Sequence, residues 1–145
     1  MNREILFRAK HIHEIPGNGH LDGTWVHGYL SDKNYIYDKS LDGEFLVDED
    51  TICQYTGLTD KNGKKIFEGD IVRYGETCGE VKFGLHESNW QIGKYNQGFF
   101  VTFPKEYLLR NELGFWRNKV VVAGNVFDNP ELLEKSEENS NGKDI

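Results

Sequence analysis

The chain has 145 residues, enough for one domain with a buried core, and its formal net charge is -7. This acidic balance disfavours non-specific binding to nucleic acid and to anionic lipid, because both carry charge of the same sign. No apolar run reaches the roughly 18 residues of a membrane-spanning helix, no secretory signal is visible, and two cysteines are too few for a disulfide framework. We therefore expect a cytoplasmic protein.

The first 50 residues have the pattern of short strands separated by turns. Contents of 13% aromatic residues and 16 glycines favour such an arrangement. Residues 5–12 alternate in polarity, and Asp42-Gly43 is typical of a tight turn. Strands are expected at 5–12, 25–30, 35–37 and 44–47.

The run from Thr51 to Val72 carries the strongest local signals in the chain. It begins with a predicted strand. Asn62-Gly63 then predicts a hairpin turn, because both residue types tolerate a positive φ. Glu68-Gly69-Asp70 predicts a second turn, in which acidic side chains bond backbone amides, and a strand follows over 70–74.

The rest of the chain predicts more strands and two short helices. Strands are expected at 79–83, 99–103 and 120–127, the last buried on both faces because it is apolar throughout. One helix is expected over 104–113, ended by Gly114, and another over 129–134, capped by Asn129. The polar tail over 136–145 is expected to be disordered.

Three segments resemble the YopX family, small proteins of phages and prophages. They are the opening segment Arg3–Ala9, the run Thr51–Val72 and the closing segment Val121–Leu133. The resemblance implies a mostly β fold that contains a barrel, and a phage or prophage source. It supplies no catalytic residues. Residues 84–119 match no motif of the family, and specificity is expected to lie there.

Together, the pattern and the resemblance predict a mainly β fold. It would consist of a small SH3-like barrel around Thr51–Val72, an added antiparallel sheet from the N-terminal strands, and two short helices. The rhythm of turn and strands over 66–83 is similar to that of SH3-like barrels, an analogy of fold and not of function. A single domain is expected over 1–135.

No arrangement of residues indicates catalysis or a metal site, so we expect no cofactor and favour a non-catalytic protein over an enzyme. Cys53 lies in a strand pattern and is expected to be a buried structural thiol, whereas Cys78, before Gly79, is expected to be exposed in a turn. Glu68 and Asp70 resemble a carboxylate pair, but turn chemistry explains them better. The histidines lack the spacing of a zinc site: His11, His13, His20, His27 and His86.

A first group of candidate binding residues surrounds the Asn62-Gly63 turn. Lys61, Lys64 and Lys65 lie near Tyr55 and Tyr74 in sequence, a composition that suits single-stranded nucleic acid. A solvated hairpin tip explains the same lysines, and the acidic balance of the chain favours that explanation.

A second group lies in the segment without family motifs. Trp90, Trp116 and Arg117 would indicate a protein interface if the rings are exposed, because Trp and Arg are common interface anchors. The alternative is that the tryptophans fill the core of a small β domain.

Three functions are open from the sequence, the third of which is an enzyme with an unrecognised site. The first is a phage or prophage accessory protein that binds a phage or host protein, or itself, since many strands imply edges that pair easily. The alternative is a single-stranded nucleic-acid-binding module that uses the SH3-like barrel. No membrane partner is expected.

Overall fold

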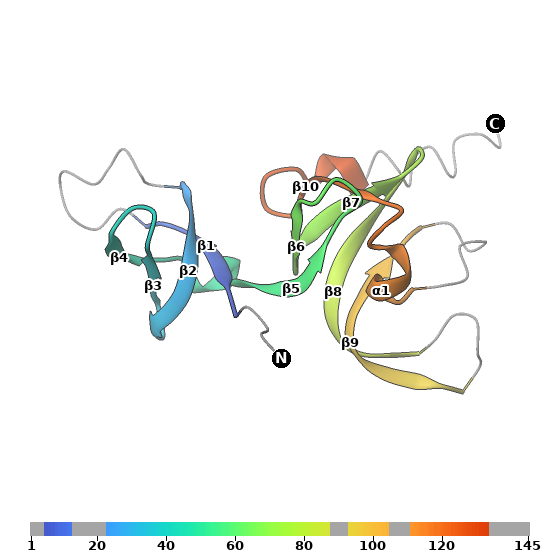
Figure 1. Ribbon diagram of the computed structural model, residues 1–145, viewed down its shortest axis with the longest axis horizontal. Coiled ribbons are helices and arrows are strands. Elements are labelled where there is room, and N and C mark those ends of the chain that lie inside the picture. The colour runs from blue at the N-terminus through green and yellow to red at the C-terminus, as the bar shows by residue number, and fades with distance from the viewer. Residues whose placement is uncertain (1–4, 13–22, 88–92, 105–110, 134–145) are drawn as a thin grey trace. The chain divides into compact units, whose positions relative to one another are not determined.

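The computed structural model describes residues 5–12, 23–87, 93–104 and 111–133, and it shows a mainly β protein with short helices (Figure 1). This confirms the predicted class of fold. The described strands form two antiparallel sheets, and no closed barrel is found among them. The chain divides into two compact units, which are Met1–Gly57 and Leu58–Ile145.

The first unit is built on a sheet with the order β4-β3-β2-β1-β5. Alternating residues of these strands enclose a core of Ala9, Val26, Ile36, Phe45 and Val47. The four strands predicted in the first 50 residues are confirmed, with small shifts at their ends. The strands are β1 (Phe7–Lys10), β2 (Trp25–Asp32), β3 (Tyr35–Asp38), β4 (Gly43–Leu46) and, after the 3-10 helix η2 (Glu49–Thr51), β5 (Cys53–Thr59).

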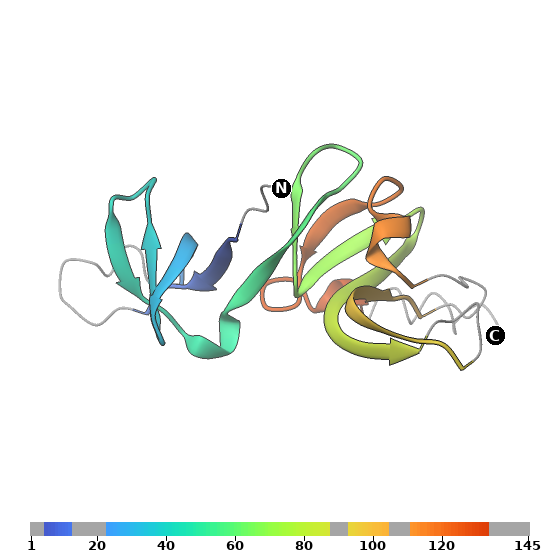
Figure 2. The same ribbon diagram turned by 60° about the horizontal axis from the view of Figure 1, so that its bottom comes forward.

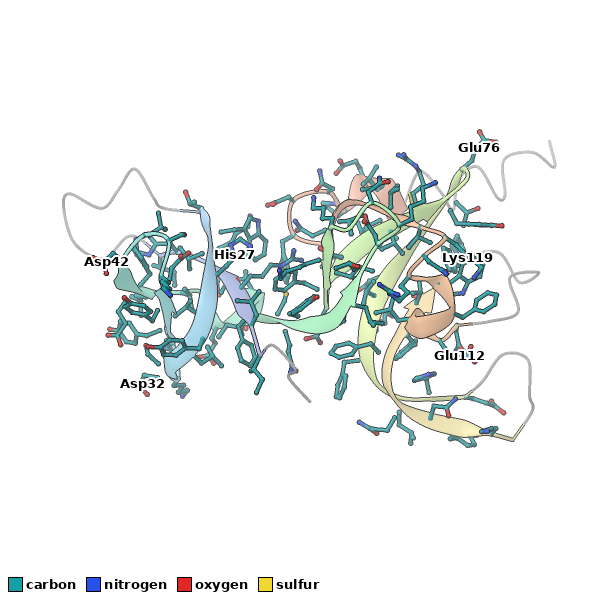
Figure 3. The ribbon with its side chains drawn as sticks, viewed as in Figure 1. His27, Asp32, Asp42, Glu76, Glu112 and Lys119 are labelled. Carbon is teal, nitrogen blue, oxygen red and sulfur yellow. The ribbon has the colours of Figure 1, made fainter. Side chains whose placement is uncertain are left out.

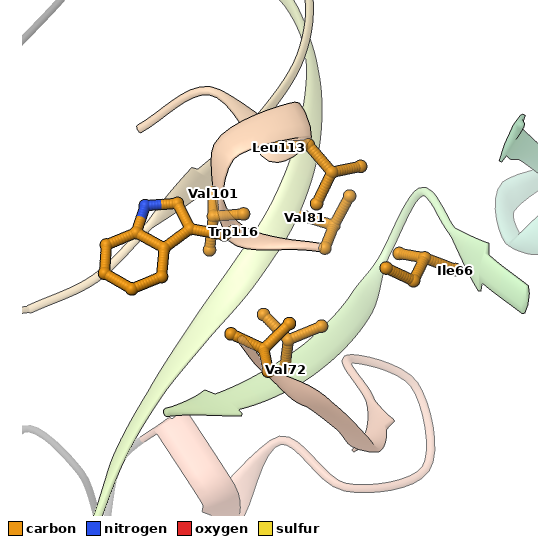
Figure 4. Close-up of a cluster of buried hydrophobic side chains, with 7 residues drawn as sticks. Ile66, Val72, Val81, Val101, Leu113 and Trp116 are labelled. Atoms are coloured by element: carbon orange, nitrogen blue, oxygen red, sulfur yellow. The ribbon is translucent and has the colours of Figure 1, made fainter. Parts of the chain in front are cut away.

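The second unit contains the end of β5, the short strand β6 that follows it in the same sheet, and a separate four-stranded sheet with the order β10-β7-β8-β9. The elements are β6 (Lys65–Phe67), β7 (Asp70–Tyr74), β8 (Thr77–Glu87), β9 (Tyr95–Thr102), the helix α1 (Leu113–Trp116) and β10 (Val121–Asn125). Figure 4 shows the core of this unit, formed by Ile66, Val72, Val81, Val101, Leu113, Trp116 and Val120.

The prediction of a helix over 104–113 is wrong at the C-terminal end of that range. Residues 105–110 lie outside the described ranges. Glu112 forms a bridge with Phe100 of β9 instead of a helical turn. Helix α1 then begins at Leu113, so Gly114, expected to end a helix, is its second residue. Leu113 and Trp116 are three residues apart and both enter the core, which outweighs the low helical propensity of glycine.

The second predicted helix is confirmed where the structure describes it, over 131–133. Its predicted cap is not formed as expected, because the side-chain oxygen of Asn129 accepts from the amide of Asn125 in β10 at 3.2 Å. The tail over 136–145 lies outside the described residues. Strand β10 is half-buried rather than buried on both faces, since it is an edge strand; only Val120 before it is fully buried.

Strands β8 and β9 form a hairpin that is longer than the sequence predicted. Their ladder runs without a register shift from Glu80 opposite Thr102 to Glu87 opposite Tyr95. Gly84 and Gly98 face each other in this ladder with φ values of 147° and 152°, a backbone conformation that favours glycine. The two strands curve together (Figure 2). The predicted strands stopped at these glycines, whereas the ladder bends there and continues.

Candidate functional site

The two buried carboxylates of the run Thr51–Val72, Asp60 and Asp70, bond backbone amides. Asp60 is buried, and its Oδ1 accepts from the amides of Asn62 and Lys64, both at 2.9 Å. Its Oδ2 accepts from the amide of Val122 in β10 at 2.8 Å. Burial alone would raise the pKa of Asp60, but the amides of Val122, Lys64 and Asn62 outweigh it and hold the pKa below its usual value.

Of the two turns of this run, the first forms by a means different from that expected. Gly63 has a φ of 86°, but Asn62 does not have a positive φ, so the Asp60 carboxylate and not a pair of left-handed residues shapes the hairpin tip. In the second turn Asp70 is buried and its Oδ2 accepts from the amide of Phe67 at 2.7 Å. This confirms the turn chemistry that was expected of Asp70, and it makes this carboxylate a structural group.

The hairpin tip carries a basic patch, which we define as Lys61, Lys64, Lys65 and Lys119. All four side chains are exposed. The amide of Lys61 donates to the carbonyl of Val120 at 3.1 Å, which brings Lys119 close to the tip from a distant part of the sequence. Figure 3 shows Lys119 beside α1. The Lys119 ammonium itself donates to the carbonyl of Phe115 in α1 at 2.8 Å, so Lys119 borders the three lysines of the turn through its backbone.

One exposed ring lies at the same end of the second unit. Tyr74 ends β7 and is 43% exposed. Because Arg73 faces Val121 in the ladder, Tyr74 lies beside Val120, and its ring packs edge-on against Trp116 with centroids 4.9 Å apart. Tyr74 and the hairpin tip thus both lie beside Val120 in the second unit.

The other candidate aromatics are placed differently. Trp116 is 4% exposed and packs against Phe103 and Phe115, so it belongs to the core. Tyr55 is buried in the first unit, where its ring is not available for stacking. Trp90 lies outside the described residues.

Arg117 holds the end of β5. Its Nε donates to the carbonyl of Thr59 at 3.2 Å, and one of its terminal nitrogens donates to the Thr59 hydroxyl at 3.0 Å. Arg117 is a half-buried residue, and both bonds engage its guanidinium within the second unit. Arg117 therefore links the segment after α1 to the end of β5.

A surface that the sequence did not identify lies on the β8–β9 hairpin. We define the apolar stripe as Phe83, Leu85, Tyr95 and Phe99. Phe83, Leu85 and Tyr95 are 50%, 69% and 60% exposed, and half-buried Phe99 lies opposite Phe83 with ring centroids 4.7 Å apart. The four share a face because side chains alternate along each strand. The alternation of Val81, Phe83 and Leu85 across Gly84 is the sequence signal that could have identified this surface.

Neither cysteine has the surroundings of a reactive thiol. Cys53 is buried, as expected, and its thiol donates to the carbonyl of Thr51 at 3.3 Å. Cys78 is also buried, and burial raises the pKa of its thiol despite the nearby charge of Arg73. The expected exposure of Cys78 is wrong, because β8 begins one residue before it and pairs it with Arg73.

The histidines are dispersed. His11 is buried against the carbonyl of Leu46, exposed His27 lies on β2, and His86 stacks on Phe100, while His13 and His20 lie outside the described ranges. In the part of the chain that the structure describes, no three His, Cys, Asp or Glu side chains are grouped so that they could hold a metal ion. The same part contains no helix of the length and hydrophobicity needed to cross a membrane.

The model of the YopX protein family matches residues 20–134, which is more than half of the chain. The chain belongs to the YopX family. The match extends across both compact units and includes the whole run Thr51–Val72, whose turns and buried carboxylates are described above. No curated protein matches this YopX-family chain significantly.

Proposed function

We propose that this YopX-family protein is a non-catalytic interaction module, an accessory or regulatory protein of a phage or prophage that acts in the cytoplasm of the bacterial host. The observation that supports this proposal is the apolar stripe on the β8–β9 hairpin. Single exposed hydrophobic residues are common on protein surfaces, whereas neighbouring ones on one face are typical of binding surfaces.

The composition of the stripe suits a protein partner. Phe83 and Tyr95 are rigid aromatic residues of the kind that anchor interfaces. Exposed Gln97 lies among them and Glu87 lies at the distal end of the same face, so polar groups border the apolar centre. The partner would be a phage protein, a host protein or a second copy of this chain.

The test is affinity capture of the tagged full-length protein from host cells in which the phage or prophage is active. Captured proteins are identified by mass spectrometry after nuclease treatment. We expect a nuclease-resistant protein partner that is lost with Phe83→Ser or Leu85→Ser. The matched control is Leu41→Ser, which removes another exposed apolar side chain, 44% exposed, from the first unit. Capture that is equal for all variants would contradict the proposal.

A second candidate function is binding of single-stranded nucleic acid by the second unit, with its strands acting as an SH3-like β domain. The basic patch and the exposed ring of Tyr74, which lies beside Val120 like the hairpin tip, support it. The net charge of -7 and the burial of Tyr55 weigh against it, because only Tyr74, one of the two candidate rings of this group, is exposed for stacking.

This second candidate predicts salt-sensitive binding to single-stranded DNA or RNA. Binding should be lost when Lys61, Lys64 and Lys65 are all changed to Glu. The matched control changes three other exposed lysines, Lys33, Lys39 and Lys82, to Glu and alters the net charge equally. No binding at low salt, or equal loss with both triple variants, would reject a specific role for the basic patch.

A further inference from the structure

The sheet of the first unit carries tyrosines on the face that points away from its core. Val26 of β2 is buried in that core, and Tyr29 lies three residues further along the strand, so its side chain points to the opposite face. Tyr29 is paired with Tyr37 of β3, and Tyr37 is paired with Glu44 of β4. Directly opposed residues share a face. We define the tyrosine row as Tyr29, Tyr37 and Glu44.

The two rings of this row support each other and leave Tyr29 accessible. Tyr29 is 56% exposed, and its ring stacks on that of Tyr37 with centroids 5.5 Å apart. The hydroxyl of Tyr37 donates to Oδ1 of Asp42 in the turn before β4 at 3.2 Å, a bond that raises the pKa of Tyr37 (Figure 3). In the sheet, β2 lies between β1 and the strands that carry Tyr37 and Glu44.

The same face supplies its own cations to a different ring. The Arg8 guanidinium lies 4.8 Å from the centroid of the Trp25 ring, and the Lys10 ammonium lies 5.5 Å from it. Among the described residues, no cation lies over Tyr29 in this way, and the carboxylate of Glu44 has no hydrogen-bond or ion-pair partner. The fold therefore provides Trp25 with cations and leaves the tyrosine row without them.

The charge around the tyrosine row favours a cationic ligand. Between residues 29 and 50 the sequence has seven acidic residues and two lysines, Lys33 and Lys39. Both lysines lie in turns, one before β3 and one after it. Aromatic rings attract cations through their faces, and neighbouring carboxylates add to this attraction. Arginine suits such a site better than lysine, because its planar guanidinium stacks on rings and bonds carboxylates with two N–H groups.

We propose that the tyrosine row binds an arginine-bearing segment of a partner protein, with one guanidinium stacked on Tyr29 and a second bonded to Glu44. Two strand spacings, about 10 Å in all, separate these two positions. In an extended segment, arginines on either side of one intervening residue lie on the same face about 7 Å apart, and their long side chains cover the difference. The protein would then have two binding surfaces of different chemistry, since the apolar stripe lies in the other unit.

The test is a titration of the full-length protein against a fluorescent peptide of alternating arginine and serine, followed by anisotropy. A peptide of alternating lysine and serine, with equal charge, should bind more weakly. Tyr29→Ala and Glu44→Gln should each raise the Kd of the arginine peptide about fivefold. The matched controls lie in the second unit: Tyr95→Ala removes a tyrosine that is 60% exposed, and Glu76→Gln removes an exposed acid. Both should bind like the unchanged protein.

A second measurement does not depend on any variant. In NMR spectra of the unchanged protein, the arginine peptide should shift the signals of Tyr29, Tyr37 and Glu44, and shifts confined to the second unit would overturn the proposal. The absence of binding, equal Kd values for the two peptides, or equal weakening by Glu44→Gln and Glu76→Gln would also overturn it. The proposed function is tested separately, because Leu85→Ser should abolish partner capture and leave the Kd of the arginine peptide unchanged.

Discussion

The hairpin tip over Asp60–Lys64 and the β8–β9 hairpin lie in the same unit and use their residues in opposite ways. The tip directs a polar group inward, where the Asp60 carboxylate meets three backbone amides. The β8–β9 hairpin directs apolar groups outward, with Leu85 at 69% exposed. The more conspicuous motif is therefore structural, whereas most of the exposed apolar stripe lies in residues 84–119, where the sequence showed no family motif.

The largest effect is expected from Trp116, a candidate binding residue that the structure places in the core. Trp116→Ala should lower the free energy of unfolding by about 3–5 kcal/mol, because it removes a buried ring that three other aromatic rings contact. Denaturant titration of the full chain measures this loss. A cost below about 1 kcal/mol, similar to that of an exposed residue, would show that the ring does not belong to the core.

Asp60 should have the next largest effect. Asp60→Ala leaves three amides without their acceptor and should destabilise the protein by about 2–3 kcal/mol. The same titration compares it with Asp50→Ala, a change at an exposed acid of the first unit. If both variants lost the same free energy of unfolding, Asp60 would not have the structural role that its three hydrogen bonds indicate.

The lowered pKa of Asp60 also predicts a dependence of stability on pH. A folded-state pKa below the unfolded value of about 3.9 means that the unfolded chain binds more protons in acid. The contribution of Asp60 is therefore fully present above that value and is lost as the pH falls through the folded pKa. In unfolding experiments from pH 6 to pH 2, Asp60→Ala should lose less stability than the unchanged protein, and parallel curves would contradict this.

A smaller effect is expected at the bend of the β8–β9 hairpin. Gly98→Ala places a side chain at a φ of 152° and should cost about 1–3 kcal/mol through backbone strain. Gly114→Ala is the matched control, because Gly114 lies in α1 with open space around it and alanine favours a helix. Thermal unfolding should give Gly98→Ala a lower melting temperature than Gly114→Ala. Equal melting temperatures would contradict the need for glycine at the bend.

The smallest effect on stability is expected from the apolar stripe. Leu85→Ser should change the free energy of unfolding by less than about 0.5 kcal/mol, since the side chain is already exposed. The same variant should abolish partner capture, which separates a binding role from a structural one. A large loss of stability would instead show that Leu85 is covered within the protein.

The sequence by itself located most of the strands, though not the full length of β8 and β9, and it indicated the turns near Asp42, Gly63 and Asp70 and the YopX family, because these depend on local alternation and on the residues that turns require. It also predicted the burial of Cys53. Each of these features is set by residues close together in the chain, where the pattern of side chains is sufficient.

Only the tertiary structure decided which side chains the fold uses and which it leaves exposed. Asp60 is structural because Val122, far along the chain, supplies its third amide, and Glu112 is not helical because β9 offers it a bridge. The stripe is visible only once β8 and β9 are in register. Burial and pairing depend on residues distant in sequence, so a pattern read along the chain identifies the strands but not their faces or their partners.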